Sequence, residues 1–296
     1  MSEAGRLCPL RYRYGAQALA RAPEQPAETL YVVGGLYGNL HALDALDTLV
    51  AVERGPVQVV FNGDFHWFDV DDRGFVEVDR RVAAHHAILG NVEAELGEEG
   101  DAAGCGCAYP DSVDAGTVER SNRIHARLKA TARHHPDVLA RLAGLPMYMR
   151  WRVGALAVGV VHGDAESLAG WGFDPAALDD ASRRAWLETC FAQARVDVFA
   201  SSHTCTPALR RFGSGLVINN GAAGMSNAPT DMRGLITRIS TLPSPHAARD
   251  GAVCDGVHIG LVPLAFDLQS WRRAFLANWP KGTDAHRSYW RRIAGA

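Results

Sequence analysis

Residues 30–40 read LYVVGGLYGNL and residues 57–64 read VQVVFNGD. Each segment is an apolar run that ends on glycine and a polar residue, as short buried strands do. Between the two runs, apolar side chains recur at the three- and four-residue spacing of a helix with one buried face, at Leu40, Leu43, Leu46 and Val50. This strand–turn–helix–strand order predicts an α/β fold with its functional site at the carboxyl ends of the strands.

The rest of the chain adds elements of the same kind. A third strand is predicted at 87–89, and residues 97–111 form a glycine-rich loop. Residues 113–143 are predicted to be helical with a break near His135, and a further helix is expected over 174–195. Other short strands are predicted at 147–151, 156–161, 196–200, 208–212, 216–218, 235–239 and 260–266.

These elements predict one domain, residues 1–296, that contains two sheets; a domain boundary near residue 145 is the alternative. Residues 1–28, with Pro23 and Pro26 close together, are expected to form an irregular lead-in. Residues 268–296 carry five aromatic side chains and are expected to form a helical arm packed on the body.

Composition narrows the class of protein. The 296 residues are 47% hydrophobic and 21% charged, which are globular values. A net charge of −3 gives no indication of a nucleic-acid partner. Six cysteines are too few for a disulfide scaffold, and no apolar run approaches the roughly 18 residues of a membrane span. Because the N-terminus also lacks a signal-peptide pattern, we expect a cytoplasmic protein with no membrane partner, and the oligomeric state stays open.

Polar residues follow the predicted strands at Asp64, Asn91, His162 and His203. They supply one carboxylate, one amide carbonyl and two imidazoles, a ligand set that suits Mn²⁺, Fe²⁺ or Zn²⁺. The glycines before Asp64 and Asn91 permit sharp turns that aim both side chains into one pocket. Taken singly, each of the four could instead be a turn residue, a helix cap or a buried structural histidine.

Five motifs resemble, in order and spacing, those of the calcineurin-like metallophosphoesterases, whose pattern is D-x-H, G-D, G-N-H-[DE], a lone His and G-H-x-H. The segments that carry the resemblance are Gly34–Asn39, Asn62–Asp64, Gly90–Glu93, Val161–Asp164 and Ser202–Cys205. Gly38-Asn39-Leu40 is also similar to the G-N-L of the bacterial phosphodiesterase-like branch, and the resemblance spans residues 30–225.

The resemblance implies an α/β four-layer sandwich of two mixed β-sheets flanked by helices, with a two-metal phosphoesterase site. It implies that the second metal is held by Asp64, Asn91, His162 and His203, all of which are present. In this frame, metal ligation is the favoured interpretation of the four residues.

The chain departs from the pattern around the first metal. Gly35 and Tyr37 stand at the D-x-H positions, Val92 replaces the usual proton-donating His, and Cys205 replaces the last His. Of the first-metal ligands only the shared Asp64 remains, with Cys205 as a soft replacement. We therefore predict one intact divalent metal site per chain and a second site that is dismantled.

A second, rebuilt metal site is the alternative. His66 could act as a ligand or as a catalytic acid, and Cys105 and Cys107 could join Cys205 in a thiolate site for Zn²⁺. The same loop cysteines could instead be a redox pair or plain loop residues. His66 could simply pack on its aromatic neighbours, and Cys205 could be a small buried hydrophobe.

Four other residues have predicted roles near the site. Tyr37 is predicted as a catalytic residue, either as a neutral hydroxyl that hydrogen-bonds a phosphate or as a phenolate bound to the ion. Asn39 of the G-N-L segment and the guanidinium of Arg120 are predicted to bind substrate, with a solvated helix face as the alternative for Arg120. Glu93 is expected to act indirectly, as a carboxylate at a helix start.

The leading hypothesis is a metal-dependent phosphoesterase that hydrolyses a small phosphomonoester, phosphodiester or nucleotide with a metal-activated water. A second hypothesis is a degenerate phosphoesterase fold that holds a metal or a phosphate ligand without turnover. A third is thiol chemistry at Cys105, Cys107 and Cys205.

Overall fold

The computed structural model describes residues 4–228 and 230–295. In these ranges, twelve strands form two six-stranded mixed sheets. The first sheet has the order β1 (Glu24–Ala27), β5 (Tyr148–Val153), β6 (Leu156–Val161), β7 (Val198–Ser201), β9 (Gly215–Asn219) and β8 (Ala208–Phe212). The second sheet has the order β11 (Asp250–Cys254), β12 (Val257–Leu264), β10 (Gly234–Ser240), β2 (Thr29–Val33), β3 (Val57–Asn62) and β4 (His86–Ile88).

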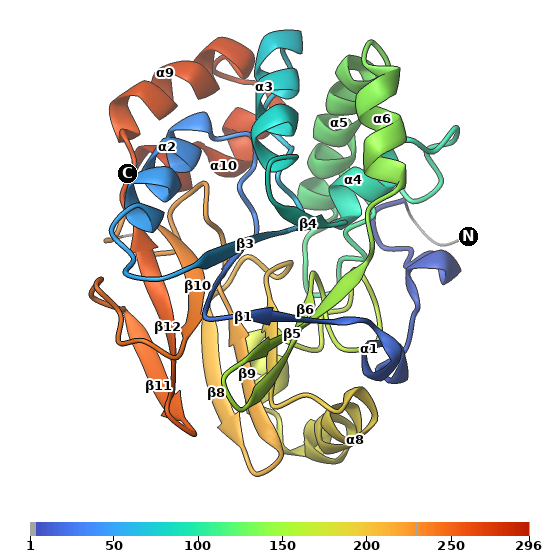
Figure 1. Cartoon of the computed structure of the whole chain (residues 1–296). Helices are drawn as coiled ribbons and strands as arrows, with labels where there is room; N and C mark the ends of the chain where they lie inside the picture. The colour runs from blue at the N-terminus through green and yellow to red at the C-terminus, as the bar shows by residue number, and fades with distance from the viewer. Residues whose placement is uncertain (1–3, 229, 296) are drawn as a thin grey trace.

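Helices cover the outer faces of both sheets (Figure 1). Against the second sheet lie α2 (Leu40–Val50), α3 (Asp72–Val82), α4 (Asn91–Leu96), α5 (Ala115–Ala132), α6 (Pro136–Ala143), α9 (Leu268–Asn278) and α10 (Asp284–Ala294). Against the first sheet lie α1 (Gln17–Arg21), α7 (Pro175–Asp179) and α8 (Arg184–Ala194). This order of layers confirms the predicted α/β four-layer sandwich.

Apolar side chains of the two inner faces meet in a central core. Val32 and Val60 of the second sheet and Val158 of the first are fully buried in it. Because successive side chains of a strand alternate, Tyr31 and Phe61 point the other way and pack under the helices. β2 runs parallel to β3, and β6 runs parallel to β7. The polar motifs that follow these strands therefore lie together at the carboxyl ends of each pair.

Most of the predicted strands and helices are confirmed to within a few residues. The sequence pattern does not predict α3 or β11, because α3 is largely polar and β11 is an exposed edge strand. The helix expected over 174–195 is interrupted after α7, where Asp180 caps a short 3₁₀ turn (Ala181–Arg183) that leads into α8.

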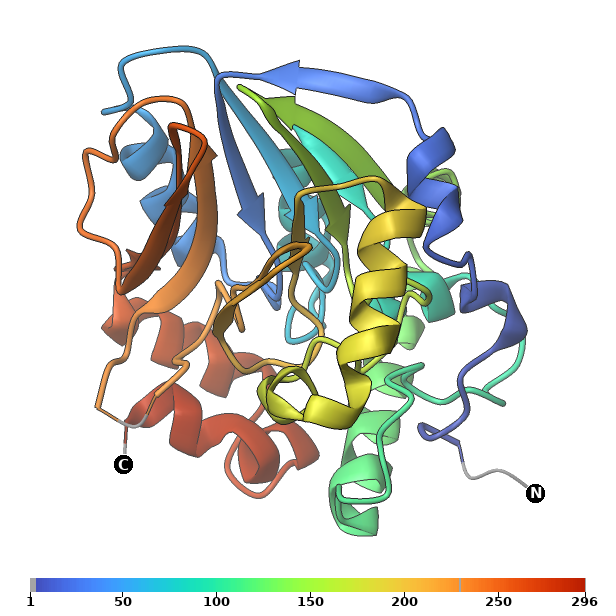
Figure 2. The ribbon, with the colours of Figure 1, turned by 90° about the horizontal axis from the view of Figure 1, so that it is seen from below.

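The expectation of an irregular lead-in over residues 1–28 is wrong for the described part. A 3₁₀ turn (Leu10–Tyr12), α1 and β1 all lie in this segment. β1 pairs in parallel with β5, and the Glu24 carboxylate accepts hydrogen bonds from Arg150 and Arg152 (Figure 2, blue strand beside the green one). Pro26 is tolerated because β1 is an edge strand, where one missing N–H costs little.

The C-terminal segment confirms the expected helical arm through residue 295. α9 and α10 bury Trp271, Phe275 and Ile293 against the helical layer of the second sheet. None of the helices in the described part of the chain has the length and apolarity needed to cross a membrane.

A buried ion pair ties β10 to the segment after α2. The side chains of Arg238 and Glu53 are 1% and 2% exposed, and the Tyr31 hydroxyl also donates to this carboxylate. Burial alone would raise the pKa of Glu53, but Arg238 and Tyr31 lower that pKa overall. The carboxylate therefore stabilises the fold above its ordinary pKa, and this contribution is lost as the pH falls through the lowered value.

Replacing Glu53 with Gln should lower the free energy of unfolding at neutral pH by about 3–5 kcal/mol, because the Arg238 charge stays buried without its partner. Urea denaturation measures the change. The control Glu77→Gln breaks an exposed pair with Arg80 and should leave the midpoint unchanged. Equal shifts of the urea midpoint in the two variants would contradict the stabilising role of the buried Arg238–Glu53 pair.

Candidate metal centre

Four buried side chains converge where strands of both sheets end. Asp64 follows β3 and Asn91 opens α4 after β4, both from the second sheet. His162 follows β6 and His203 follows β7, both from the first sheet. Their exposed fractions are 5%, 1%, 0% and 6%, in chain order. The centre therefore lies at the junction of the two sheets, and each half of it depends on a different sheet.

The four donor atoms are close enough together to share one ion. His162 Nε2 lies 3.1 Å from Asn91 Oδ1, 3.2 Å from His203 Nδ1 and 3.4 Å from Asp64 Oδ1. Ligand bonds of about 2.0–2.2 Å place neighbouring ligand atoms roughly 3.0–3.5 Å apart around a small divalent ion. Asp64, His162 and His203 also form a group whose ligand atoms all lie within 4.8 Å of one another. The residues present therefore fit a single divalent cation.

Backbone carbonyls orient both imidazoles for this task. Nδ1 of His162 lies 2.8 Å from the Asn62 carbonyl, and Nε2 of His203 lies 3.1 Å from the Cys107 carbonyl. A neutral imidazole that donates to a carbonyl through one nitrogen presents a lone pair at the other. His162 and His203 thus aim two lone pairs at the same point. A hydrogen bond from the other ring nitrogen to a carbonyl is the usual outer contact of a metal-ligating histidine.

The charges at the centre are strongly coupled. Burial favours a neutral Asp64, yet His162 holds the pKa of that carboxyl below its usual range. Burial also disfavours a charged His162, but Asp64 raises the pKa of this imidazole overall. Burial and the neighbouring His162 lower the pKa of His203 to about 3. The Asp64 carboxylate thus favours a positive charge beside it, which is the charge that a metal ion would supply.

Glu93 joins the two loops that carry Asp64 and Asn91. Its carboxylate accepts hydrogen bonds from the backbone N–H groups of Asp64, His66 and Gly90 at 2.8, 3.1 and 3.0 Å. Gly90 has no room for a side chain, because a Cβ there would lie 2.4 Å from the Asp64 nitrogen. Glu93 is therefore a positioning residue, as its place at a helix start predicts.

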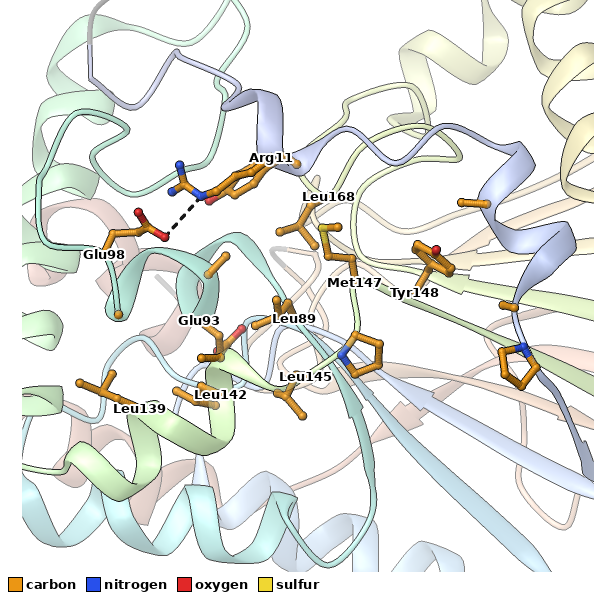
Figure 3. Close-up of a pocket in the computed structure, with 18 of the residues that line it drawn as sticks. Arg11, Leu89, Glu93, Glu98, Leu139, Leu142, Leu145, Met147, Tyr148 and Leu168 are labelled. Atoms are coloured by element: carbon orange, nitrogen blue, oxygen red, sulfur yellow. Dashed lines mark ion pairs between the residues drawn. The ribbon is translucent and has the colours of Figure 1, made fainter.

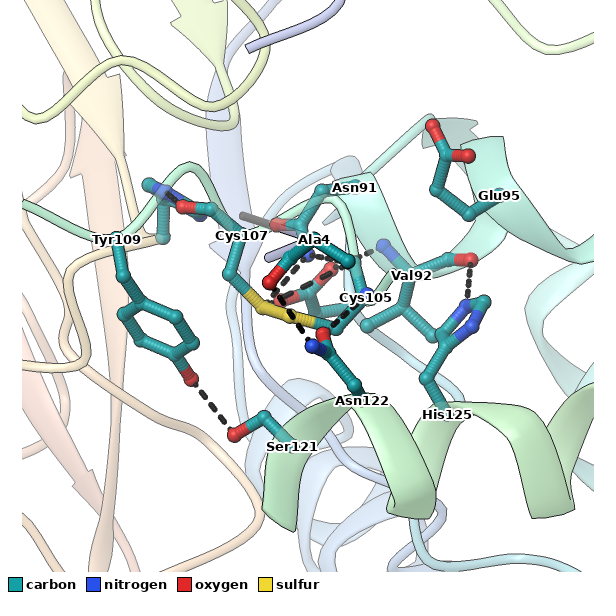
Figure 4. The surroundings of a disulfide bond; sticks show 12 residues. Ala4, Asn91, Val92, Glu95, Cys105, Cys107, Tyr109, Ser121, Asn122 and His125 are labelled. Atoms are coloured by element: carbon teal, nitrogen blue, oxygen red, sulfur yellow. Dashed lines mark hydrogen bonds between the residues drawn. A yellow bond between two sulfur atoms is a disulfide. The ribbon is translucent and has the colours of Figure 1, made fainter. Parts of the chain in front are cut away.

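A disulfide loop closes one side of the centre. Cys105 and Cys107 are bonded to each other, and the Cys105 carbonyl accepts a hydrogen bond from Asn91 Nδ2 at 2.9 Å (Figure 4). That bond turns Asn91 Oδ1 toward His162. The pairing contradicts the predicted thiolate site with Cys205, because a disulfide sulfur is not a thiolate ligand, whereas it agrees with the redox-pair alternative.

Comparison with known proteins rests on structure alone. No family sequence model matches the chain, and no curated protein matches it in sequence. A metallophosphoesterase from Sphaerobacter thermophilus is similar over 91% of this chain and 100% of its own, with 16% identity and a TM-score of 0.56. This chain has the metallophosphoesterase fold. A hypothetical protein from Pyrococcus horikoshii is similar over 87% of this chain and 96% of its own, with 15% identity and a TM-score of 0.57. The predicted resemblance is confirmed at the level of the fold.

Protein atoms fill the space around Gly35 and Tyr37, the two positions that the motif resemblance assigns to the first metal. A Cβ added at Gly35 would lie 3.0 Å from the ring carbons and the hydroxyl of Tyr37, so the phenol ring occupies the space of a side chain at position 35. The Tyr37 hydroxyl lies 2.8 Å from Cys205 Sγ. The two departures from the motif are thus complementary, since the glycine makes room for the tyrosine ring.

Backbone strain is concentrated at the same place. Tyr37, Asp64 and Cys205 adopt φ values of 57°, 52° and 55°, a left-handed region that costs a side-chain-bearing residue about 1 kcal/mol or more. Such conformations persist where the surrounding contacts hold them, and they cluster at functional sites.

The structure places His66 away from the metal donors, which does not support its predicted catalytic or ligand role. Its ring is fully buried, stacks on Phe75 and lies 2.5 Å from an Asp69 carboxylate oxygen. Residues 64 and 66 of a regular strand would share a face, but β3 ends at Asn62 and Asp64 adopts a left-handed φ of 52°, so this alternation is broken and His66 packs under the helical layer. The alternative of packing on aromatic neighbours agrees with this position.

The predicted substrate-binding roles of Asn39 and Arg120 are likewise not supported. Asn39 is fully buried, caps α2 by accepting from Ala42 and donates to the Gly224 carbonyl. Arg120 donates to Ser288 on α10 and to Thr117 on its own helix. Both side chains hold elements together and have their hydrogen bonds inside the protein.

Several residues at the centre carry no signal in the sequence. The carbonyls of Asn62 and Cys107 orient the two imidazoles, but a backbone group has no residue type to recognise. Arg292 reaches Cys205 from α10, which follows Cys205 by some eighty residues. Only the aromatic and basic content of the C-terminal arm hints that this segment packs on the body.

A large cavity lies elsewhere in the molecule. It measures about 720 Å³ and is lined mainly by apolar side chains such as Leu89, Leu142 and Met147, with Arg11 and Glu98 paired at one side (Figure 3). None of the four metal-binding candidates lines it. The cavity is therefore separate from the candidate centre, although Glu93 borders it.

Chains loaded with Mn²⁺ and freed of excess metal should retain about one ion each by elemental analysis. His162→Ala should retain less than roughly a tenth of that amount, because it removes the donor that the other three surround. The control His134→Ala alters an exposed imidazole beside Asp72 and should keep the full content. Two ions in the wild type, or full retention in His162→Ala, would contradict this model.

If the Tyr37 ring fills the position of the first metal, removing it should open that position to a second ion. The triple variant Gly35→Asp/Tyr37→His/Cys205→His removes the phenol ring and restores the motif, so it should take up a second ion. Gly35→Asp alone should stay at one ion, because the Tyr37 ring still occupies the space. Elemental analysis distinguishes the variants, and a triple variant with one ion would show that something other than these residues closes the site.

Proposed function

We propose that the chain is a metal-dependent phosphoesterase that works with one divalent ion, Mn²⁺, Fe²⁺ or Zn²⁺, held by Asp64, Asn91, His162 and His203. The observation that carries the proposal is the set of donor distances of 3.1–3.4 Å around His162 Nε2. The metallophosphoesterase fold supports it. The substrate proposed is a small phosphorylated molecule.

A divalent ion held there would acidify a water molecule and polarise a phosphoryl oxygen. The protein contributes the orientation of the donors: the Asn62 carbonyl holds His162, the Cys107 carbonyl holds His203, and Glu93 holds the Asp64 loop. These contacts reduce the reorganisation needed when a charged substrate arrives.

The residues beside the centre favour substrates with good leaving groups. Val92, at the position of the family's proton donor, is apolar and 2% exposed. Burial raises the pKa of the Tyr37 hydroxyl well above its ordinary value, and Cys205 and Asp64 add to this, so Tyr37 is a poor acid. Water would form the new P–O bond while the leaving oxygen departs as an anion and takes its proton from solvent. Aryl phosphates and phosphoanhydrides fit this requirement best.

One observation favours the alternative of a ligand-binding fold without turnover. Tyr37 and Val92 replace two functional positions with groups that neither bind a second ion at neutral pH nor donate a proton readily. The cytoplasmic location and the substrate within its class stay predictions.

The Mn²⁺-loaded chain should hydrolyse p-nitrophenyl phosphate or bis(p-nitrophenyl) phosphate, and chelation should abolish the reaction. Asp64→Asn should lower kcat/KM by at least about 100-fold, because the carboxylate neutralises the ion and holds it. Asp72→Asn, an exposed carboxylate beside His134 and His135, serves as the control and should match the wild type. Hydrolysis that survives Asp64→Asn would contradict the mechanism, and metal binding without hydrolysis would favour the alternative.

A further inference from the structure

A guanidinium lies beside the centre, on the side where the first metal of the family would stand. Arg292, near the end of α10, donates from Nη2 to the Cys205 carbonyl at 3.4 Å. The same nitrogen and Nε donate to the Ser226 carbonyl at 2.8 and 3.0 Å. Cys205 in turn contacts the Tyr37 hydroxyl, so a chain of contacts leads from Arg292 through Cys205 to the Tyr37 ring.

We propose that Arg292, together with the Tyr37 hydroxyl, forms an oxyanion subsite in which the guanidinium takes over the charge of the missing first metal and binds the phosphoryl group of the substrate. This inference rests on the proposed function, and it names the group that completes the site. The ligand chemistry is a phosphate oxyanion that bridges the ion and the guanidinium.

The charge on Arg292 is available for this role. In residues 4–228 and 230–295, Arg292 forms no ion pair with a carboxylate; it donates to the backbone carbonyls of Ser226 and Cys205 and also interacts with the Cys205 thiol. A neutral carbonyl fixes the guanidinium without cancelling its charge.

The geometry of the guanidinium also suits an anion. The three bonds to backbone carbonyls use only Nε and Nη2 among the three nitrogens that carry the five N–H groups, so none of these bonds involves the Nη1 amino group. The two bonds to the Ser226 carbonyl fix the plane of the fork. A preoriented donor of this kind loses less rotamer entropy when an oxyanion binds.

The approach to this side of the centre is more open than the centre itself. Cys205 and Arg292 are partly exposed and Thr206 is exposed, whereas the four metal-binding candidates are buried. The partly exposed side of the centre is thus the one that carries Cys205 and Arg292.

One divalent ion would not balance the charge of a phosphate dianion, because the Asp64 carboxylate adds a further negative charge at the same point. Two-metal sites solve this problem with a second cation 3.5–4 Å from the first. Charge-assisted hydrogen bonds from arginine also bind phosphate oxyanions strongly. Arg292 is the guanidinium in contact with Cys205 at this place.

The test measures binding of inorganic phosphate to the full-length Mn²⁺-loaded chain by isothermal titration calorimetry. Arg292→Gln keeps one N–H₂ donor for the Ser226 carbonyl but removes the charge, and it should weaken phosphate binding about 10- to 100-fold. Arg292→Lys should recover part of the loss. Metal content should be unchanged in both, since Arg292 is not a ligand.

Arg272→Gln is the matched control. Arg272 also holds α10 by donating to backbone carbonyls, and these bonds go to Ile293 and Ala294, not to Cys205. It should bind phosphate like the wild type. Equal weakening in Arg272→Gln and Arg292→Gln would show that Arg292 only anchors the helix, and wild-type affinity in Arg292→Gln would also overturn the inference.

Failure of the inference and failure of the proposed function give different results. Hydrolysis by the wild type with unchanged phosphate affinity in Arg292→Gln overturns the inference and leaves the function standing. Phosphate binding that depends on Arg292 without any hydrolysis overturns the function and leaves the subsite standing. A metal-loaded wild type that binds no phosphate overturns the subsite.

Discussion

The structure around the centre depends on two imidazole nitrogens that face each other. His162 Nε2 and His203 Nδ1 lie 3.2 Å apart, and carbonyls on their far sides assign the lone pairs to this gap. Two lone pairs at that distance repel unless a proton or a metal lies between them. The remaining contacts, from Glu93 and the Cys105–Cys107 loop, hold this arrangement in place and bring Asp64 and Asn91 to the same point.

The sequence predicts the central features because they depend on periodicity and on side-chain chemistry. Residues 30–64 carry the alternation and the helix spacing that place Asp64 at a strand end, and the structure confirms that order. His66, only two residues away, shows the limit of this reasoning, since its role depends on which face of the loop it occupies. The position of Arg292 beside Cys205 could not be predicted, because it depends on how α10, which is distant from Cys205 in the sequence, packs on the body.

The three residues that depart from the first-metal motif, Gly35, Tyr37 and Cys205, pack against one another. Gly35 leaves space, the Tyr37 ring occupies it, and Cys205 accepts the contact of the phenol hydroxyl. Tyr37 and Cys205 thus form a packed cluster at the positions that the resemblance assigns to the first metal, with Arg292 at its edge. In the proposed single-ion centre, the fold and the four candidate ligands are retained without a second cation, and the chemistry would differ from that of a two-metal site.

The most direct test is anomalous diffraction from crystals of the Mn²⁺-loaded protein, recorded at the manganese edge. The account predicts one anomalous peak in contact with Asp64, Asn91, His162 and His203, with no second peak beside Tyr37 and Cys205. A peak in the space between Gly35 and Cys205, or no peak at the junction of the two sheets, would contradict the single-ion centre.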